Sequence, residues 1–269
     1  MERFSNYLKE IRSKGKRSFT LDQAMKDLKL KRGNILTSVY RAKKRSEIIS
    51  PASGLYVIVP PEHQAYGCIP AEELTPILMD YMQADYYVAL LSAAAYYGAS
   101  HQKSASFQII SNKRFIKPLN FGQIYIECIY KKSIAGLPTR NITVNTGYLK
   151  VSTPEVTAMD LLRYSAKSGG LNHIATVLSE LIESIDPDKL LALAQSSDEK
   201  AWVQRLGYIL EKIEPMNDTF AKTTIDKLSD HLATQRRRYI PLASEKGSED
   251  FTRSKRWNII ENTTIESDL

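Results

Sequence analysis

The first 60 residues carry almost all of the chain's excess positive charge. They contain 14 Lys and Arg against 5 Asp and Glu, which gives them a net charge of +9. Residues 61–269 contain the other 23 of the chain's 37 Lys and Arg and the other 25 of its 30 Asp and Glu, which gives them a net charge of −2. A basic segment beside a near-neutral one is typical of polyanion binding, because neutralising phosphates releases condensed counterions. A solubilising surface has the same charge, so the residue pattern is needed to choose between the two.

Apolar residues in this basic segment recur at helical spacing. One stripe predicts a first helix and consists of Phe4, Tyr7, Leu8 and Ile11. Thr20 is placed to cap a second helix, which a short turn separates from a third helix over residues 32–45. The residues expected to be buried in the third helix are Ile35, Leu36, Val39 and Ala42.

Two β-rich runs follow the third helix. Residues 47–50 and 55–59 are separated by the turn sequence of residues 51–54, which predicts a hairpin. Three helices and a hairpin predict an N-terminal winged helix-turn-helix over residues 1–60. In that arrangement the third helix enters the major groove of DNA.

The outward face of the third helix is therefore the predicted DNA-binding surface. Asn34 suits an adenine edge, and Arg41 and Lys44 suit a guanine edge or phosphates. The predicted DNA-binding residues are Arg32, Asn34, Thr37, Ser38, Tyr40, Arg41, Lys43, Lys44 and Arg45, together with Ser53 at the tip of the wing. The alternative is that the cations at residues 43–45 only complement the helix macrodipole.

A second basic surface is a further hypothesis. It would consist of Lys113, Arg114, Lys117, Arg236, Arg237 and Arg238. These residues would extend the polyanion track or meet a partner, although solvated helix and loop ends explain them equally well.

Residues 61–269 are predicted to form a larger mixed α/β domain with a helical second half. Prolines at positions 60 and 61 mark its start as a stiff linker. Its sheet-containing part is expected over residues 61–152, its helical part over 153–240 and a closing tail over 241–269. A helix is expected over residues 86–97, and strands over 106–110, 123–130, 140–144 and 148–152. The whole chain is thus predicted to be α+β.

Four segments in this second part carry a family resemblance. The first is an alanine-rich stretch from Tyr86 to Gln102, and the second is Ser152-Thr153-Pro154-Glu155 followed by Asp160-Leu161-Leu162. The third runs from Gln204 to Glu211, and the fourth runs from Arg256 to Asn262 with Ile265-Glu266. In this order, and following the basic residues 1–60, they resemble the AbiEi-type antitoxins, which are transcriptional regulators of type IV toxin–antitoxin systems.

The resemblance implies a specific pair of functions. The winged helix would bind inverted repeats in the promoter of its own operon and repress it. The C-terminal antitoxin domain, residues 61–269, would neutralise a cognate toxin of the nucleotidyltransferase fold, directly or indirectly. The system would serve phage defence by abortive infection.

Other function classes have little support in the sequence. The two cysteines and four isolated histidines have no metal or catalytic spacing, so no metal, cofactor or enzymatic activity is expected. The longest nearly apolar stretch is too short to span a bilayer, so no membrane partner and a cytoplasmic location are expected. Two alternatives stay open: a one-component regulator with a ligand-sensing C-terminal domain, and a metal-dependent nuclease.

Overall fold

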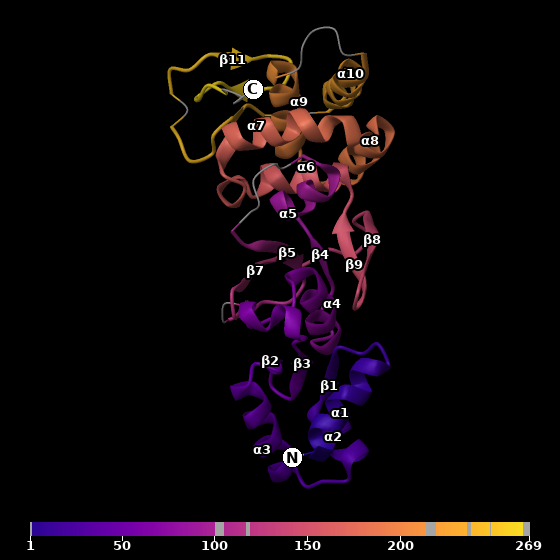
Figure 1. Ribbon diagram of the computed structural model, residues 1–269. Helices are drawn as coiled ribbons and strands as arrows, with labels where there is room; N and C mark the ends of the chain where they lie inside the picture. The colour runs from indigo at the N-terminus through magenta and orange to yellow at the C-terminus, as the bar shows by residue number, and fades with distance from the viewer. Residues whose placement is uncertain are drawn as a thin grey trace. The chain divides into compact units, whose positions relative to one another are not determined.

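The chain folds into two compact units. The computed structural model describes residues 2–99, 105–116, 119–213, 219–235, 238–247 and 249–265. Contacts between Cα atoms define unit 1 as Met1–Val88, Ala105–Ala135 and Asn141–Val151, and unit 2 as Ala89–Ser104, Gly136–Arg140 and Ser152–Leu269. The chain is a mixed α/β protein with several sheets (Figure 1). The predicted division at residue 60 does not coincide with the boundary of either unit and stays a prediction.

The N-terminal part of unit 1 places helices around a small antiparallel sheet. Its elements are α1 (Glu2–Ser13), β1 (Ser18–Thr20), α2 (Leu21–Leu28), α3 (Arg32–Lys44), β2 (Ile48–Ala52) and β3 (Leu55–Ile58). The sheet has the order β1-β3-β2. The predicted cap of α2 is confirmed, because Thr20 Oγ1 accepts a hydrogen bond of 3.1 Å from Gln23 N. Strand β1 was not predicted.

These elements share one hydrophobic cluster. It contains the whole predicted stripe of α1 and joins α1, α2, α3 and the sheet: Phe4, Tyr7, Leu8, Ile11, Phe19, Leu21, Ala24, Leu28, Ile35, Val39, Ala42, Ile48, Tyr56 and Ile58. Leu36 does not belong to it and is 39% exposed, so the prediction that Leu36 is buried was wrong. At about 100° per residue, Leu36 lies a quarter turn beyond Ile35, outside the narrow stripe of α3 that the cluster covers.

The second part of unit 1 is built on a larger mixed sheet. Strands β4 (Tyr86–Val88), β5 (Phe107–Ser111), β6 (Leu119–Phe121), β7 (Ile124–Tyr130), β8 (Thr139–Val144) and β9 (Gly147–Ser152) have the order β6-β7-β5-β4-β9-β8. The strands predicted over residues 106–110, 123–130, 140–144 and 148–152 are confirmed within one or two residues. Strand β4 pairs antiparallel with β5 and parallel with β9, and it therefore lies inside the sheet.

Two predictions for this region were wrong. Tyr86–Val88 form strand β4 rather than the start of a helix, and the helix begins at residue 90 as α5 (Leu90–Ala94), followed by the 3-10 helix η2 (Ala95–Tyr97). A short apolar run fits a buried strand as well as a helix, so its spacing alone is ambiguous. Residues after Pro60 form the 3-10 helix η1 (Pro61–Tyr66) rather than a linker, and α4 (Ala71–Tyr81) follows it.

Unit 2 is largely helical, as predicted from its apolar spacing. Its longer helices are α6 (Pro154–Arg163), α7 (Gly170–Leu181), α8 (Pro187–Ser196), α9 (Ala201–Ile213) and α10 (Thr219–Ala233). Short 3-10 turns η3 (Ser165–Lys167) and η4 (Ile182–Ser184) flank α7. Asp186 caps α8 by accepting hydrogen bonds from the backbone N of Asp188 and Lys189 at 3.0 and 3.2 Å.

The C-terminal tail packs on α9 through two of the segments that carry the resemblance. Strands β10 (Ile240–Pro241), β12 (Ile259–Ile260) and β11 (Arg253–Ser254) form a small sheet in that order. Trp257 is fully buried, and its Nε1 donates to Glu211 at 2.7 Å. A Cβ atom on Gly207 would lie 1.9 Å from the Trp257 ring, so this glycine makes room for the indole.

Candidate nucleic-acid interface

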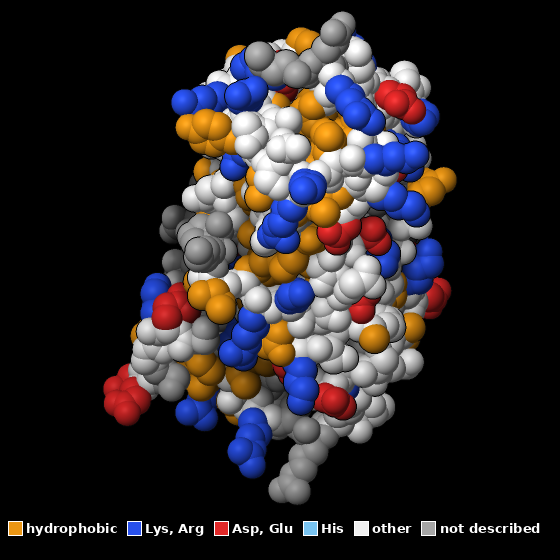
Figure 2. Space-filling view, turned by 90° about the horizontal axis from the view of Figure 1, so that it is seen from below, with side chains coloured by type: hydrophobic (Ala, Val, Ile, Leu, Met, Phe, Trp, Pro, Cys, Tyr) orange, Lys and Arg blue, Asp and Glu red, His pale blue; other side chains and the backbone are white. Residues whose placement is uncertain are grey.

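The outward face of α3 carries cations and no carboxylate. Of the ten predicted DNA-binding residues, nine are exposed and Ser38 is half-buried. The last turn of α3 holds Arg41, Lys43 and Lys44, and the first turn holds no acid. Figure 2 shows the molecule from below in the view of Figure 1, where Lys and Arg side chains are spread over the visible face and outnumber Asp and Glu. The predicted α3 residues thus lie on the part of the helix surface that the hydrophobic cluster leaves uncovered.

Several of these side chains already have partners within unit 1. The hydroxyls of Thr37 and Ser38 donate to carbonyl oxygens one turn earlier, at 3.0 Å in both cases. Arg45 donates two hydrogen bonds of 2.9 Å to Glu47, and this carboxylate raises the pKa of the Arg45 guanidinium. Glu47 therefore neutralises Arg45 in part, and Arg45 attracts phosphate less than it would without this carboxylate.

One cation is positioned by an aromatic ring. Lys44 Nζ lies 4.9 Å from the centroid of the Tyr40 ring, one turn earlier on the same helix. A cation over a tyrosine face is attracted by the ring quadrupole, which holds the ammonium near the surface of α3. The two side chains therefore form a single projecting unit on this face, with Tyr40 59% exposed.

The hairpin turn is held by α4. Residues 53 and 54 form the turn between β2 and β3. The turn was predicted over residues 51–54, so it begins two residues later than expected. The carbonyl of Ser53 accepts a hydrogen bond of 2.7 Å from Tyr81 Oη, and Leu21 N donates to the Gly54 carbonyl at 2.8 Å. Ser53 is exposed, but its carbonyl oxygen is already engaged by Tyr81 of α4.

The second predicted basic surface is only partly described. Lys113 Nζ donates to the Met82 carbonyl at 2.9 Å, and the Arg114 guanidinium lies 4.4 Å from the centroid of the Tyr130 ring. These two residues belong to unit 1, whereas Arg238, which is exposed, belongs to unit 2. Lys117, Arg236 and Arg237 lie outside the described residues. The second surface stays a prediction.

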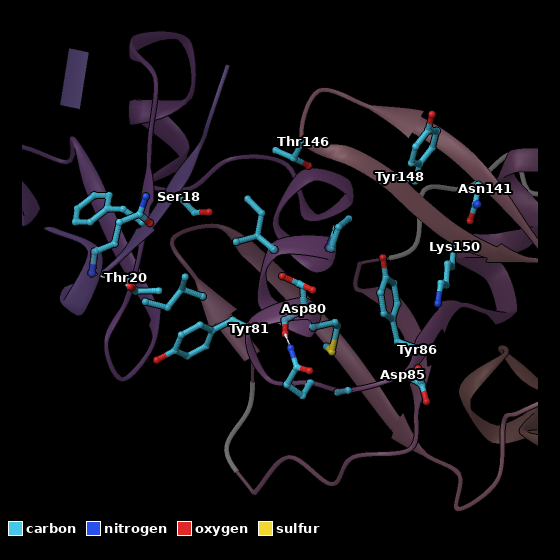
Figure 3. Close-up of a pocket in the computed structure, with 18 residues that line it drawn as sticks. Ser18, Thr20, Asp80, Tyr81, Asp85, Tyr86, Asn141, Thr146, Tyr148 and Lys150 are labelled. Carbon is cyan, nitrogen blue, oxygen red and sulfur yellow. Dashed lines mark hydrogen bonds between the residues drawn. The ribbon is translucent and has the colours of Figure 1, made fainter. Parts of the chain in front are cut away.

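A pocket of about 820 Å³ lies in unit 1, and none of the ten predicted DNA-binding residues lines it. Figure 3 shows the ring of Tyr86 and the side chain of Lys150 facing it from the sheet, with Asp80 and Tyr81 on the α4 side. Ser18, Thr20 and Gln23 line it from β1 and the start of α2. Its lining is mostly polar, and sequence reasoning missed it because these residues are far apart in the chain.

Metal, thiol and membrane chemistry have little support in the described residues. The part of the chain that the structure describes holds no group of three His, Cys, Asp or Glu residues placed to bind a metal ion. Burial raises the pKa of both free thiols, Cys68 and Cys128, to about 12, so neither is a reactive thiolate near neutral pH. None of the described helices combines the length and the apolar character that a membrane span requires.

Comparison with known families finds a matching family model. Residues 87–212, from β4 to the end of α9, match the model of the AbiEi antitoxin C-terminal domain. Over these residues the chain is similar to the AbiEi antitoxins. The resemblance stated from the sequence is thereby confirmed, and the AbiEi family is an antitoxin family rather than an enzyme family.

The AbiEi match is accompanied by a distant structural likeness. The chain is similar to the crystal structure of the RV2827C protein from Mycobacterium tuberculosis, with a TM-score of 0.67, 14% identity, and coverage of 97% of this chain and 91% of that one. At this identity the likeness concerns the fold alone. No curated protein matches the chain.

Proposed function

We propose that the chain is the antitoxin of a type IV toxin–antitoxin system and that it represses its own operon. In this proposal residues 1–60 form a winged helix-turn-helix that binds inverted repeats in the promoter. The AbiEi domain neutralises a toxin of the nucleotidyltransferase fold, directly or indirectly. The observation that carries the DNA-binding part is the face of α3, which is exposed, cationic and free of carboxylates.

The order of elements supports the winged helix-turn-helix. Helices α2 and α3 are separated by residues 29–31, and Lys29 in this turn adopts a left-handed backbone with φ of 50°. The hairpin β2-β3 follows α3 and pairs with β1. In such a module the second helix of the pair lies in the major groove, which is about 12 Å wide and admits an α-helix.

The distribution of charge along this module supports a phosphate partner. Between Asp27 and Glu47 there is no acid, whereas the cations are Lys29, Lys31, Arg32, Arg41, Lys43, Lys44 and Arg45. Cations at both ends of α3 suit the two phosphate strands that border a groove. One module of this size makes few base contacts, so we propose that two copies occupy the inverted repeats.

A pair of assays in cells separates the two functions. The full chain is expected to rescue growth when the toxin is induced and to repress a reporter driven by its own promoter. The double variant Arg41→Ala, Lys44→Ala should lose repression and keep rescue, because both side chains are exposed on α3. Repression by this variant at the wild-type level would refute the assignment of α3, and failure of the wild-type chain to rescue would refute the antitoxin role.

The pocket favours a second candidate function, a regulator that senses a small polar ligand. Its lining includes Thr20, which caps α2, and Gln23, whose backbone N donates to that cap. A ligand bound there would contact the start of the helix pair and would alter DNA affinity through it. Screening a library of polar metabolites for a raised melting temperature, followed by DNA-binding assays on the hits, tests this candidate.

A further inference from the structure

Two apolar side chains project from the cationic face of α3. Leu36 is 39% exposed and Tyr40 is 59% exposed. They are four residues apart, so they are neighbours on one side of the helix. Residues 32 and 43 lie about 40° and 20° to one side of Leu36 around the helix axis, and Lys44 lies about 40° beyond Tyr40 on the other side; all three are exposed cations. The face therefore contains an apolar strip bordered by positive charge.

This strip is not part of the fold's core. Leu36 is absent from the hydrophobic cluster of residues 1–60, which takes only Ile35, Val39 and Ala42 from α3. Gly33, one turn before Leu36, has nothing within 4 Å of an added Cβ, so the backbone beside the strip is open. A large partner can thus approach this side of α3 closely.

The charge around the strip selects the partner. Docking two copies through this face would bring like-charged cations together, which is unfavourable. A polyanion is attracted instead, and duplex DNA combines phosphates with one apolar group in the major groove, the C5 methyl of thymine. Leucine cannot form hydrogen bonds to base edges, but it can contact this methyl group.

We propose that Leu36 is a specificity residue that contacts a thymine methyl group in the major groove, with the ring of Tyr40 covering the contact on one side. This inference rests on the proposed DNA-binding function, and it predicts that one position of the operator is a thymine. Removal of one methyl group from an apolar contact costs about 0.8 kcal/mol, which corresponds to about a fourfold decrease in affinity.

The test begins with the full chain and a random pool of duplex DNA. The selected duplex is then resynthesised with each thymine replaced in turn by deoxyuridine, which lacks only the methyl group. Wild-type protein should bind about fourfold more weakly when one particular thymine of each half-site is replaced. The Leu36→Ala variant should bind the duplex with deoxyuridine at that position as tightly as the duplex with thymine there. Phe251→Ala, which removes another exposed apolar side chain in unit 2, should keep the wild-type sensitivity.

Each other result overturns the inference. Equal binding of all deoxyuridine duplexes by the wild type, or unchanged sensitivity in Leu36→Ala, would show that Leu36 contacts no thymine methyl group. A lower oligomeric mass of Leu36→Ala without a methyl effect would assign the strip to a second copy. If the wild type selects no duplex at all, the proposed DNA binding itself is wrong; a selected duplex with no methyl effect refutes only the role of Leu36.

Discussion

The contact between Gly207 and Trp257 predicts a large cost for a small substitution. In Gly207→Ala, the new Cβ atom would lie 1.9, 2.2 and 2.5 Å from three atoms of the Trp257 ring, whereas ordinary contacts begin near 3.4 Å. The ring is rigid, fully buried and anchored by its hydrogen bond to Glu211. It therefore has to move by more than about 1 Å or leave its site.

Two limits bracket the effect. Overpacking that the core absorbs costs about 1–3 kcal/mol. Expulsion of the ring resembles truncation of a buried tryptophan, which costs about 3–5 kcal/mol. Because the clash involves three atoms of a buried ring, we expect a decrease of about 3 kcal/mol in the free energy of unfolding of unit 2.

Urea unfolding followed by tryptophan fluorescence measures this decrease, because the chain's two tryptophans, Trp202 and Trp257, both lie in unit 2. The matched control is Gly33→Ala, the same substitution in α3, where nothing lies within 4 Å and helix propensity predicts a gain of up to about 1 kcal/mol. The control is followed by circular dichroism. A Gly207→Ala protein as stable as the wild type would refute the packing of the tail on α9.

Three further predictions concern helix capping, thiol reactivity and the division of functions between the two parts of the chain. Asp186→Ala removes the cap of α8 and should destabilise unit 2. A hydrogen bond from the backbone N of Lys189 lowers the pKa of Asp186, so the stability that this carboxylate contributes is present above its ordinary pKa of 3.8 and is lost as the pH falls through the lower folded-state value, which acid titration of the melting temperature would show. The pKa values of Cys68 and Cys128 are raised to about 12, so both thiols should resist iodoacetamide at pH 8 in the folded chain and react after unfolding in urea. Mass spectrometry measures the alkylation, and rapid alkylation of the native protein would contradict this prediction. Residues 1–60, which have their own hydrophobic cluster, should retain DNA binding when truncated after Pro60 but should not rescue cells from the toxin; rescue by the fragment would show that the functions are assigned to the wrong parts.

The helices could be predicted where one apolar stripe faces one core. The α1 stripe and the Thr20 cap depend on residues close in sequence, and the structure has both. Tyr86–Val88 could not be assigned in this way, because a short apolar run buried on both sides has no distinguishing period. Three-residue strands such as β1 are set by their partner β3 rather than by their own sequence.

The candidate site was only partly predictable for the same reason. The exposed cations of α3 follow from helical spacing, because none of them falls in the buried stripe of Ile35, Val39 and Ala42. The exposure of Leu36 depends on how much of α3 its neighbours cover, and the pairing of Arg45 with Glu47 depends on the turn into β2. The pocket gathers residues from positions 18 to 150, which no local pattern relates.

The most direct test of DNA recognition by α3 is the affinity of the full chain for its own promoter duplex over a range of salt concentrations. Log affinity should fall with log salt at a slope of about −0.9 for each phosphate neutralised, and Arg41→Ala, Lys44→Ala should weaken binding by about 1–3 kcal/mol for each base that these side chains recognise. The control Lys212→Ala, Lys222→Ala removes the same charge from exposed positions of unit 2 and should bind like the wild type. A flat salt dependence, or an equal decrease in affinity in both double variants, would contradict DNA recognition by α3.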